Sequence, residues 1–161
     1  LWINLAARDK LSPATYRDIK REEMPHLEEE GSELIALGGH WASATQAVDG
    51  PLDALAGQAG IAHVRLEGGA TLTLEQDAPT LLAYVFEGEL QIAGQTVSAQ
   101  RLASLNAGET LTLSSHSGAQ VLLLAGHPHG EPIAHYGPFV MNQREELDQA
   151  LRDYRDGTLA Q

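Results

Sequence analysis

Three histidines near the C-terminal end have the residue types and spacing of a metal site. His127 and His129 form a His-x-His pair, and His135 follows after a glutamate, Glu131. Imidazole nitrogens and carboxylate oxygens are common ligands of zinc and other transition metals, so these residues are the best local candidates for metal binding. The proline and glycine around the pair indicate a loop, in which the rings need not converge. We therefore expect surface or structural histidines here, and no metal.

The sequence offers little for nucleophilic catalysis. Ser114, Ser115 and His116 are adjacent, but a nucleophile needs a base that a third group orients across the fold. No Gly-x-Ser-x-Gly elbow is present, and the chain has no cysteine for thiol catalysis, disulfides or cysteine-ligated metals. The remaining histidines, at positions 26, 40 and 63, are isolated. We therefore predict no catalytic residue in this chain.

The charge of the chain excludes several classes of partner. Ten Lys plus Arg stand against 22 Asp plus Glu, which gives a formal net charge of −12. Such a chain has no electrostatic attraction for nucleic-acid phosphates or anionic lipids. The longest apolar runs, 81–86 and 121–125, are far shorter than the ~20 residues that cross a bilayer. No signal peptide is visible, so we expect a cytoplasmic protein with no nucleic-acid or membrane partner.

Short apolar stretches separated by glycine-rich turns dominate the middle of the chain. Extended segments are predicted at 33–37, 61–66, 70–74, 81–86, 89–93, 109–113 and 120–125. Many short strands at regular spacing are typical of a sandwich or barrel, and no helical segments alternate with them. The fold is therefore predicted to be all-β. Residues 38–60, rich in Gly, Ala and Ser, are predicted to form a long loop.

The two ends of the chain differ from this middle region. Residues 1–5 alternate Leu or Ile with Trp and Asn, which predicts a half-buried strand, and the charge-dense residues 16–30 predict a solvated surface segment. Near the other end, Asn142 is a candidate helix N-cap, with Glu145 three residues later. One apolar stripe follows and stops before a glycine; it comprises Leu147, Ala150, Leu151 and Tyr154. We therefore predict a helix over 142–157.

The stretch between Gly69 and Gly88 resembles the first motif of the cupins, which ends in a turn like that at Tyr84–Glu89. A cupin metal needs imidazoles that point into the barrel from one strand, with a third His and a carboxylate from other strands. The slots for these ligands are filled here by Glu75, Asp77, Leu81 and Leu105. Leucine binds no metal, and two carboxylates alone make a weak site. We therefore expect an emptied barrel filled by side chains.

A more specific resemblance lies near the C-terminal end. The run 135–146, His-Tyr-Gly-Pro-Phe-Val-Met-Asn-Gln-Arg-Glu-Glu, closely resembles a signature of the pirin family. Residues 1–5, 121–133 and 153–157 resemble further pirin segments in the same order. The likeness covers nearly the whole chain but only the second half of a pirin, and residues 38–60 match poorly.

The resemblance implies the C-terminal half of a two-cupin protein. Its parts are an interdomain strand and charged linker (1–30), a degenerate cupin-type jelly-roll β-barrel (31–141) and a C-terminal α-helix (142–157). The N-terminal cupin, absent from this chain, binds the family's iron or another divalent transition metal through three His and one Glu. No cofactor or metal ligand is therefore implied for this chain. The expected partner is that N-terminal half, or a second copy paired through an exposed edge strand at 1–5.

Several bacterial pirins are quercetin 2,3-dioxygenases, and the animal member is an iron-dependent transcriptional co-regulator. The resemblance therefore favours a metal-free structural or interface module of a dioxygenase-type metalloprotein. Two alternatives stay open: a non-enzymatic interaction or regulatory module, and a metal-independent small-molecule binder with Glu75, Asp77 and Tyr84 near the barrel mouth. By itself the chain is not expected to be an enzyme, and whether the parent protein is one stays open.

Overall fold

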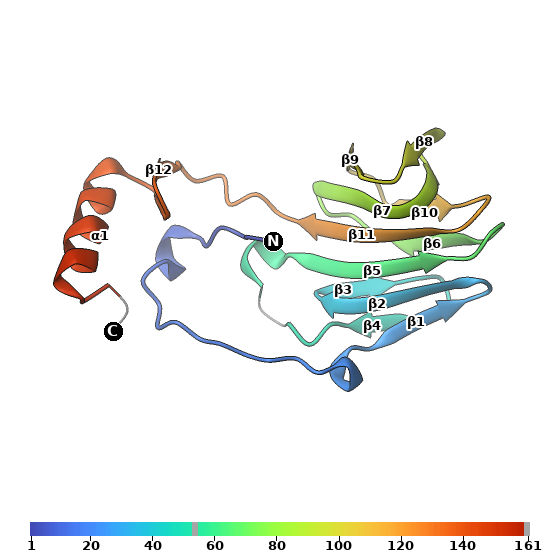
Figure 1. Ribbon diagram of the computed structural model, residues 1–161, viewed down its shortest axis with the longest axis horizontal. Coiled ribbons are helices and arrows are strands. Elements are labelled where there is room, and N and C mark those ends of the chain that lie inside the picture. Colours follow the sequence, from blue (N-terminus) through green and yellow to red (C-terminus); the bar gives the residue numbers. More distant parts are fainter. Residues whose placement is uncertain (53–54, 160–161) are drawn as a thin grey trace. The chain divides into compact units, whose positions relative to one another are not determined.

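The computed structural model describes residues 1–52 and 55–159 of the chain (Figure 1). The chain divides into two compact units: Ile19–Pro128 is the larger, and Leu1–Asp18 with the chain from His129 onward is the smaller. The larger unit is built almost entirely of strands, and the smaller one carries the single α-helix of the described residues. No helix in the described part of the chain is long and apolar enough to cross a membrane.

Eleven strands of the larger unit form one curled sheet. They are β1 (His26–Glu29), β2 (Ser32–Gly38), β3 (His40–Ala42), β4 (Ala47–Asp49), β5 (Gly60–Leu66), β6 (Thr71–Glu75), β7 (Thr80–Ile92), β8 (Gln95–Ser98), β9 (Arg101–Leu105), β10 (Thr110–Ser114) and β11 (Ala119–Gly126). Their order is β1-β2-β5-β11-β7-β10-β6-β3-β4, with β8 and β9 also paired to β7. Short 3-10 turns lie at Arg21–Glu23 and Ala56–Gln58.

The long strand β7 joins two halves of this sheet. Its first part pairs with β11 and β9, and its last residues pair with β8 and β10. One half, called the front sheet here, is therefore β1-β2-β5-β11-β7-β9, and the other is β8-β7-β10-β6-β3-β4. The two halves enclose one apolar core. The predicted all-β barrel is thereby confirmed.

The core follows from the two-residue period of the strands, which sends alternate side chains to opposite faces. Leu34, Val64, Val121 and Val85 form one inward row across four neighbouring strands, and each is fully buried. Trp41 on β3 is also fully buried, and its Nε1–H donates a hydrogen bond to the Gly38 carbonyl at 3.0 Å. Large apolar side chains therefore fill the barrel interior.

Three predictions for the barrel are wrong in detail. The expected loop at 38–60 contains β3, β4 and a 3-10 turn, because its short strands carry too few apolar residues to show a period; Asp53 and Ala54 lie outside the described residues. The charged segment before residue 30 contains β1, which pairs with β2. The expected turn at Glu87–Gly88 is continuous strand: a β-bulge at Phe86 lies opposite Gln120–Val121, and Gly88, paired with Ala119, has a φ of +75°.

The smaller unit contains a 3-10 turn (Ala7–Asp9), a hairpin of β12 (Ala134–Tyr136) and β13 (Phe139–Met141), and the helix α1 (Arg144–Asp156). The strand predicted at 1–5 is wrong, because no described strand pairs with these residues. The helix is confirmed, but its N-cap is Gln143 and not Asn142. The Glu146 carboxylate accepts the Gln143 backbone N–H at 2.8 Å, and Gly157 ends the helix with φ +71°.

Candidate functional site

The four positions expected to be emptied metal slots do not form a ligand set. Glu75 ends β6 on its exposed face, and Asp77 is exposed in the loop that follows. Leu81, which is 5% exposed, is the direct partner of Leu105 in the β7–β9 pair, and both pack with the core. The interior positions are apolar and the carboxylates face outward, so these residues do not fit a cupin-type metal ion.

A depression of about 580 Å³ lies where β3, β5, β6 and β11 begin or end. Its titratable lining residues are His40, Asp49, Glu75, Asp77 and His127. The His40 Nδ1–H donates to Asp49 Oδ1 at 2.8 Å. Glu75 and Asp77 therefore line the same depression. Tyr84 does not line this depression.

The three candidate histidines near the C-terminal end are divided between the two units. His127 belongs to the larger unit, whereas His129 and His135 belong to the smaller one. The rings of His129 and His135 each donate Nε2–H to a backbone carbonyl, Asn4 at 2.9 Å and Gly137 at 2.8 Å. These contacts are those of structural histidines.

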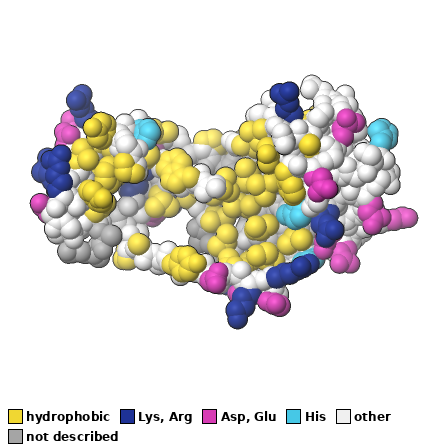
Figure 2. Space-filling model, in the orientation of Figure 1, with side chains coloured by type: hydrophobic (Ala, Val, Ile, Leu, Met, Phe, Trp, Pro, Cys, Tyr) yellow, Lys and Arg dark blue, Asp and Glu magenta, His cyan; other side chains and the backbone are white. Residues whose placement is uncertain are grey.

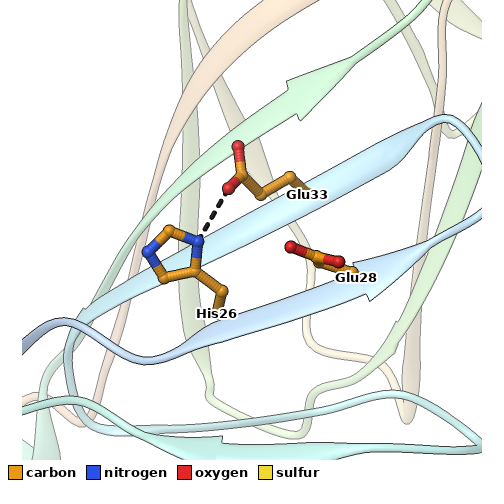
Figure 3. A group of neighbouring side chains, drawn as sticks. All are labelled: His26, Glu28 and Glu33. Atoms are coloured by element: carbon orange, nitrogen blue, oxygen red, sulfur yellow. Dashed lines mark hydrogen bonds and ion pairs between the residues drawn. The ribbon is translucent and has the colours of Figure 1, made fainter. Parts of the chain in front are cut away.

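A different cluster brings potential ligands together on the outer side of β1 and β2 (Figure 3). Glu28 and Glu33 face each other directly across the strand pair, and His26 precedes Glu28 by two residues on the same side. His26 Nδ1 and Glu33 Oε1 are 2.7 Å apart. Among the described residues, His26, Glu28 and Glu33 are the one group whose ligand atoms lie close enough to share a metal ion, within 4.8 Å of one another.

An apolar band crosses the outer face of the front sheet. One cross-strand row runs over five neighbouring strands; it consists of Ile35, His63, Leu122, Tyr84 and Leu102. Phe86, 40% exposed, adds a ring 5.3 Å from that of His63. We call this set, with Phe86, the outer row. Figure 2 shows hydrophobic side chains gathered over these strands, with histidine and charged side chains at one side.

A polar row borders the outer row on the same face. Glu33, Arg65, Gln120 and Glu87 are successive partners across β2, β5, β11 and β7. Arg65 Nη1 lies 3.5 Å from Glu33 Oε2, and the Gln120 amide donates to the Glu87 carboxylate. The outer face therefore combines an apolar centre with a charged margin, which is the usual anatomy of a protein interface.

Two carboxylates are held in their ionised form by hydrogen bonds. Ser43 Oγ and Thr45 Oγ1 each donate to Glu29 Oε1 at 2.6 Å, which lowers the pKa of Glu29. Glu131 Oε2 accepts the Ala7 backbone N–H at 2.7 Å and the Asn142 side-chain amide at 3.0 Å. The Ala7 bond is the larger cause of the lowered pKa of Glu131. Glu131 is thus a structural tie within the smaller unit.

Sequence reasoning missed the His26 cluster and the outer row. The signal for the first is the His-x-Glu spacing at 26–28, which places both side chains on one face of a strand. The His-x-Glu spacing indicates a shared face only if the charged segment 16–30 is recognised as containing a strand. The signal for the second is the alternation in 120–125, where both the inward and the outward residues include leucines.

Comparison with known proteins gives a consistent set of relatives. A family model described as the pirin C-terminal cupin domain matches residues 61–160. A protein of Pseudomonas aeruginosa that is provisionally named a quercetin 2,3-dioxygenase is 42% identical over 165 aligned residues, which cover 99% of this chain and 58% of that protein. A pirin-like protein of Caulobacter vibrioides is 35% identical over 98% of this chain and 56% of its own length.

Solved structures agree with the sequence comparison. A crystal structure of quercetin 2,3-dioxygenase from Acinetobacter baumannii superposes with a TM-score of 0.85 at 29% identity. It covers 98% of this chain, and this chain covers 55% of it. The chain therefore spans little more than half the length of the relatives it matches.

Proposed function

The chain belongs to the pirin family, and we propose that it is the non-catalytic half of a two-cupin protein, with no metal ion inside its barrel, and that it packs against a metal-bearing half. Its interior slots hold Leu81 and Leu105 in place of ligands, so the barrel supplies packing and no metal chemistry. The observation that carries the interface role is the outer row on the front sheet. The whole protein would then be a dioxygenase-type metalloprotein whose chemistry lies outside this chain.

The outer row suits the apolar centre of an interface, although it supplies only part of the ~800 Å² that each partner buries in a standard interface. Tyr84, Phe86 and Leu102 are 37%, 40% and 57% exposed. Covering about 250 Å² of these side chains contributes about 6 kcal/mol at ~25 cal/mol per Å². If no partner covers this apolar band, it stays exposed to water. Exposed apolar patches on proteins mark binding surfaces. The relatives' additional length supplies a covering partner of the required size.

Co-expression tests this role. The tagged chain is produced together with the part of the 42%-identical Pseudomonas aeruginosa relative that this chain does not cover, and co-purification is measured in comparison with Leu122→Glu. A charge at the centre of the row should cost at least the ~2 kcal/mol of an interface hot spot, or about thirtyfold in affinity. Thr112→Glu is the control, since Thr112 is exposed on β10 in the other half-sheet. Equal co-purification of both folded variants would refute the interface.

The depression at the barrel mouth favours a second candidate, a small-molecule binder that needs no metal. Three carboxylates and two imidazoles around about 580 Å³ suit a small cationic or hydroxylated ligand. Screening such compounds by ligand-observed NMR tests it, with Glu75→Gln and Asp77→Asn as the variants that should lose binding. A ligand that still binds both variants would lie elsewhere on the chain.

A further inference from the structure

The cluster on β1 and β2 lies at the β1 edge of the same outer face, where His26 is the cross-strand partner of Ile35 in the outer row and Glu33 belongs to the polar row. Antiparallel pairing sets Glu28 opposite Glu33, and the two-residue strand period sets His26 beside them. Two of the three side chains are partly shielded, His26 at 30% and Glu33 at 25% exposure. The backbone thus fixes where these groups lie, and a ligand would not have to order a loop to use them.

We propose that His26, Glu28 and Glu33 form a binding site for a divalent transition-metal ion. His26 Nδ1 and Glu33 Oε1 lie 2.7 Å apart. Two ligand atoms on one ion with bonds of ~2.1 Å are about 3.0 Å apart at right angles and about 3.4 Å apart in a tetrahedral site, so the two side chains must separate by about 0.3–0.7 Å when the ion binds. The ion replaces the hydrogen of the Nδ1–H donor. The bound ring carries one hydrogen, on Nε2, and the displaced proton goes to Nε2 or to solvent water.

Glu28 supplies the third ligand. Its carboxylate lies within 4.8 Å of the other two ligand atoms and is exposed, so a side-chain rotation brings it to the ion. Figure 3 shows all three side chains on one side of the strand pair, with Glu28 beside the His26–Glu33 contact. One nitrogen and two oxygens suit zinc and neighbouring first-row ions, and the remaining positions stay open to water.

Arg65 limits the strength of the site. Its guanidinium lies 3.5 Å from Glu33 Oε2, the oxygen that does not contact His26. This contact orients the carboxylate so that Oε1 faces the imidazole, but it also places a positive charge near the ion. With three protein ligands and this charge, the site holds metal reversibly and loses it to a chelator.

Titration of the chelator-treated chain with zinc, followed by calorimetry, tests the proposal. Cobalt(II) is the spectroscopic probe, because its visible absorption reports the ligand set. One equivalent should bind, and His26→Ala and Glu28→Gln should each weaken binding at least tenfold, the lower end of the loss that even an outer partner of a metal ligand causes. Amide NMR signals of residues 26–33 should broaden with cobalt, which locates the ion independently of any variant.

His40→Ala is the matched control, because His40 and Asp49 form a similar His–carboxylate pair at 2.8 Å without the third ligand. It should bind zinc as the unaltered chain does. A second control replaces His127 and His129 with Ala. No saturable binding, binding that survives His26→Ala in a folded variant, or loss in either control would overturn the proposal.

Discussion

Replacing the buried slot residue Leu81 by alanine should destabilise the barrel, whereas replacing the slot carboxylates should not. Leu81 is 5% exposed and packs in the main core. Core Leu→Ala substitutions cost 2–5 kcal/mol, and we expect about 3 kcal/mol here because Leu105, its cross-strand partner, is only partly buried. Glu75→Ala and Asp77→Ala remove exposed side chains and should stay within about 0.5 kcal/mol of the unaltered chain.

Urea unfolding followed by tryptophan fluorescence measures this difference. Trp41 is fully buried in the barrel and Trp2 is 69% exposed in the smaller unit, so a Trp2→Phe background leaves one reporter for the barrel. With a slope of ~2 kcal/mol per molar urea, Leu81→Ala should lower the midpoint by about 1.5 M. Equal shifts for Leu81→Ala and Glu75→Ala would refute the reasoning, since the carboxylate would then be part of a buried network.

Two further predictions concern acid stability and catalysis. Because the pKa of Glu131 is lowered in the folded chain, its stabilisation is present above the usual value of 4.5 and is lost as the pH falls through the folded pKa. Thermal melting between pH 7 and 3 should show this loss in the unaltered chain and a smaller one in Glu131→Gln; identical profiles would contradict it. The chain alone should not oxidise quercetin even with added iron or nickel, as measured by oxygen uptake, whereas any metal-dependent turnover would contradict the emptied barrel.

The barrel strands with a strong period could be predicted from the sequence. The segments 61–66, 70–74, 109–113 and 120–125 became β5, β6, β10 and β11 with bounds shifted by a residue or so. Their inward positions are filled by Val, Leu and Ala, so the alternation survives in the sequence. Burial on one face produces that alternation, and the prediction succeeds wherever burial is one-sided.

Strands β8 and β9 could not be predicted, because pairing with β7, and not burial of their own side chains, holds them in the sheet. Both pair with β7 and their side chains are mostly exposed, so no apolar period marks them. The single long strand β7 was likewise predicted as two separate strands, at 81–86 and 89–93. Gly88 indicates a turn in the sequence, but in the structure it lies within β7, where its positive φ and the Gly118 carbonyl beside it leave no room for a side chain.

The cluster of His26, Glu28 and Glu33 also depends on strand pairing that the sequence does not reveal. The composition of 26–33 indicates a charged surface, and the His26–Glu33 contact exists only because β1 and β2 pair in one register. If β1 were shifted by one residue along β2, His26 and Glu28 would lie on the opposite face of the sheet from Glu33. The metal candidates at 127–135 illustrate the converse, since close spacing in sequence did not bring their rings together.

In the front sheet, inward and outward side chains alternate along each strand, and this alternation determines which surfaces of the larger unit carry groups that can bind a ligand. Its inward residues close the barrel with aliphatic side chains, and the two interior slots pair leucine with leucine. These two slots therefore offer no ligand to a metal ion inside the described part of the barrel. The outward residues keep their variety: an apolar row over five strands, a charged row beside it, and an imidazole with two carboxylates at the β1 edge. We therefore expect partners and ligands to bind at the outer face and at the barrel mouth.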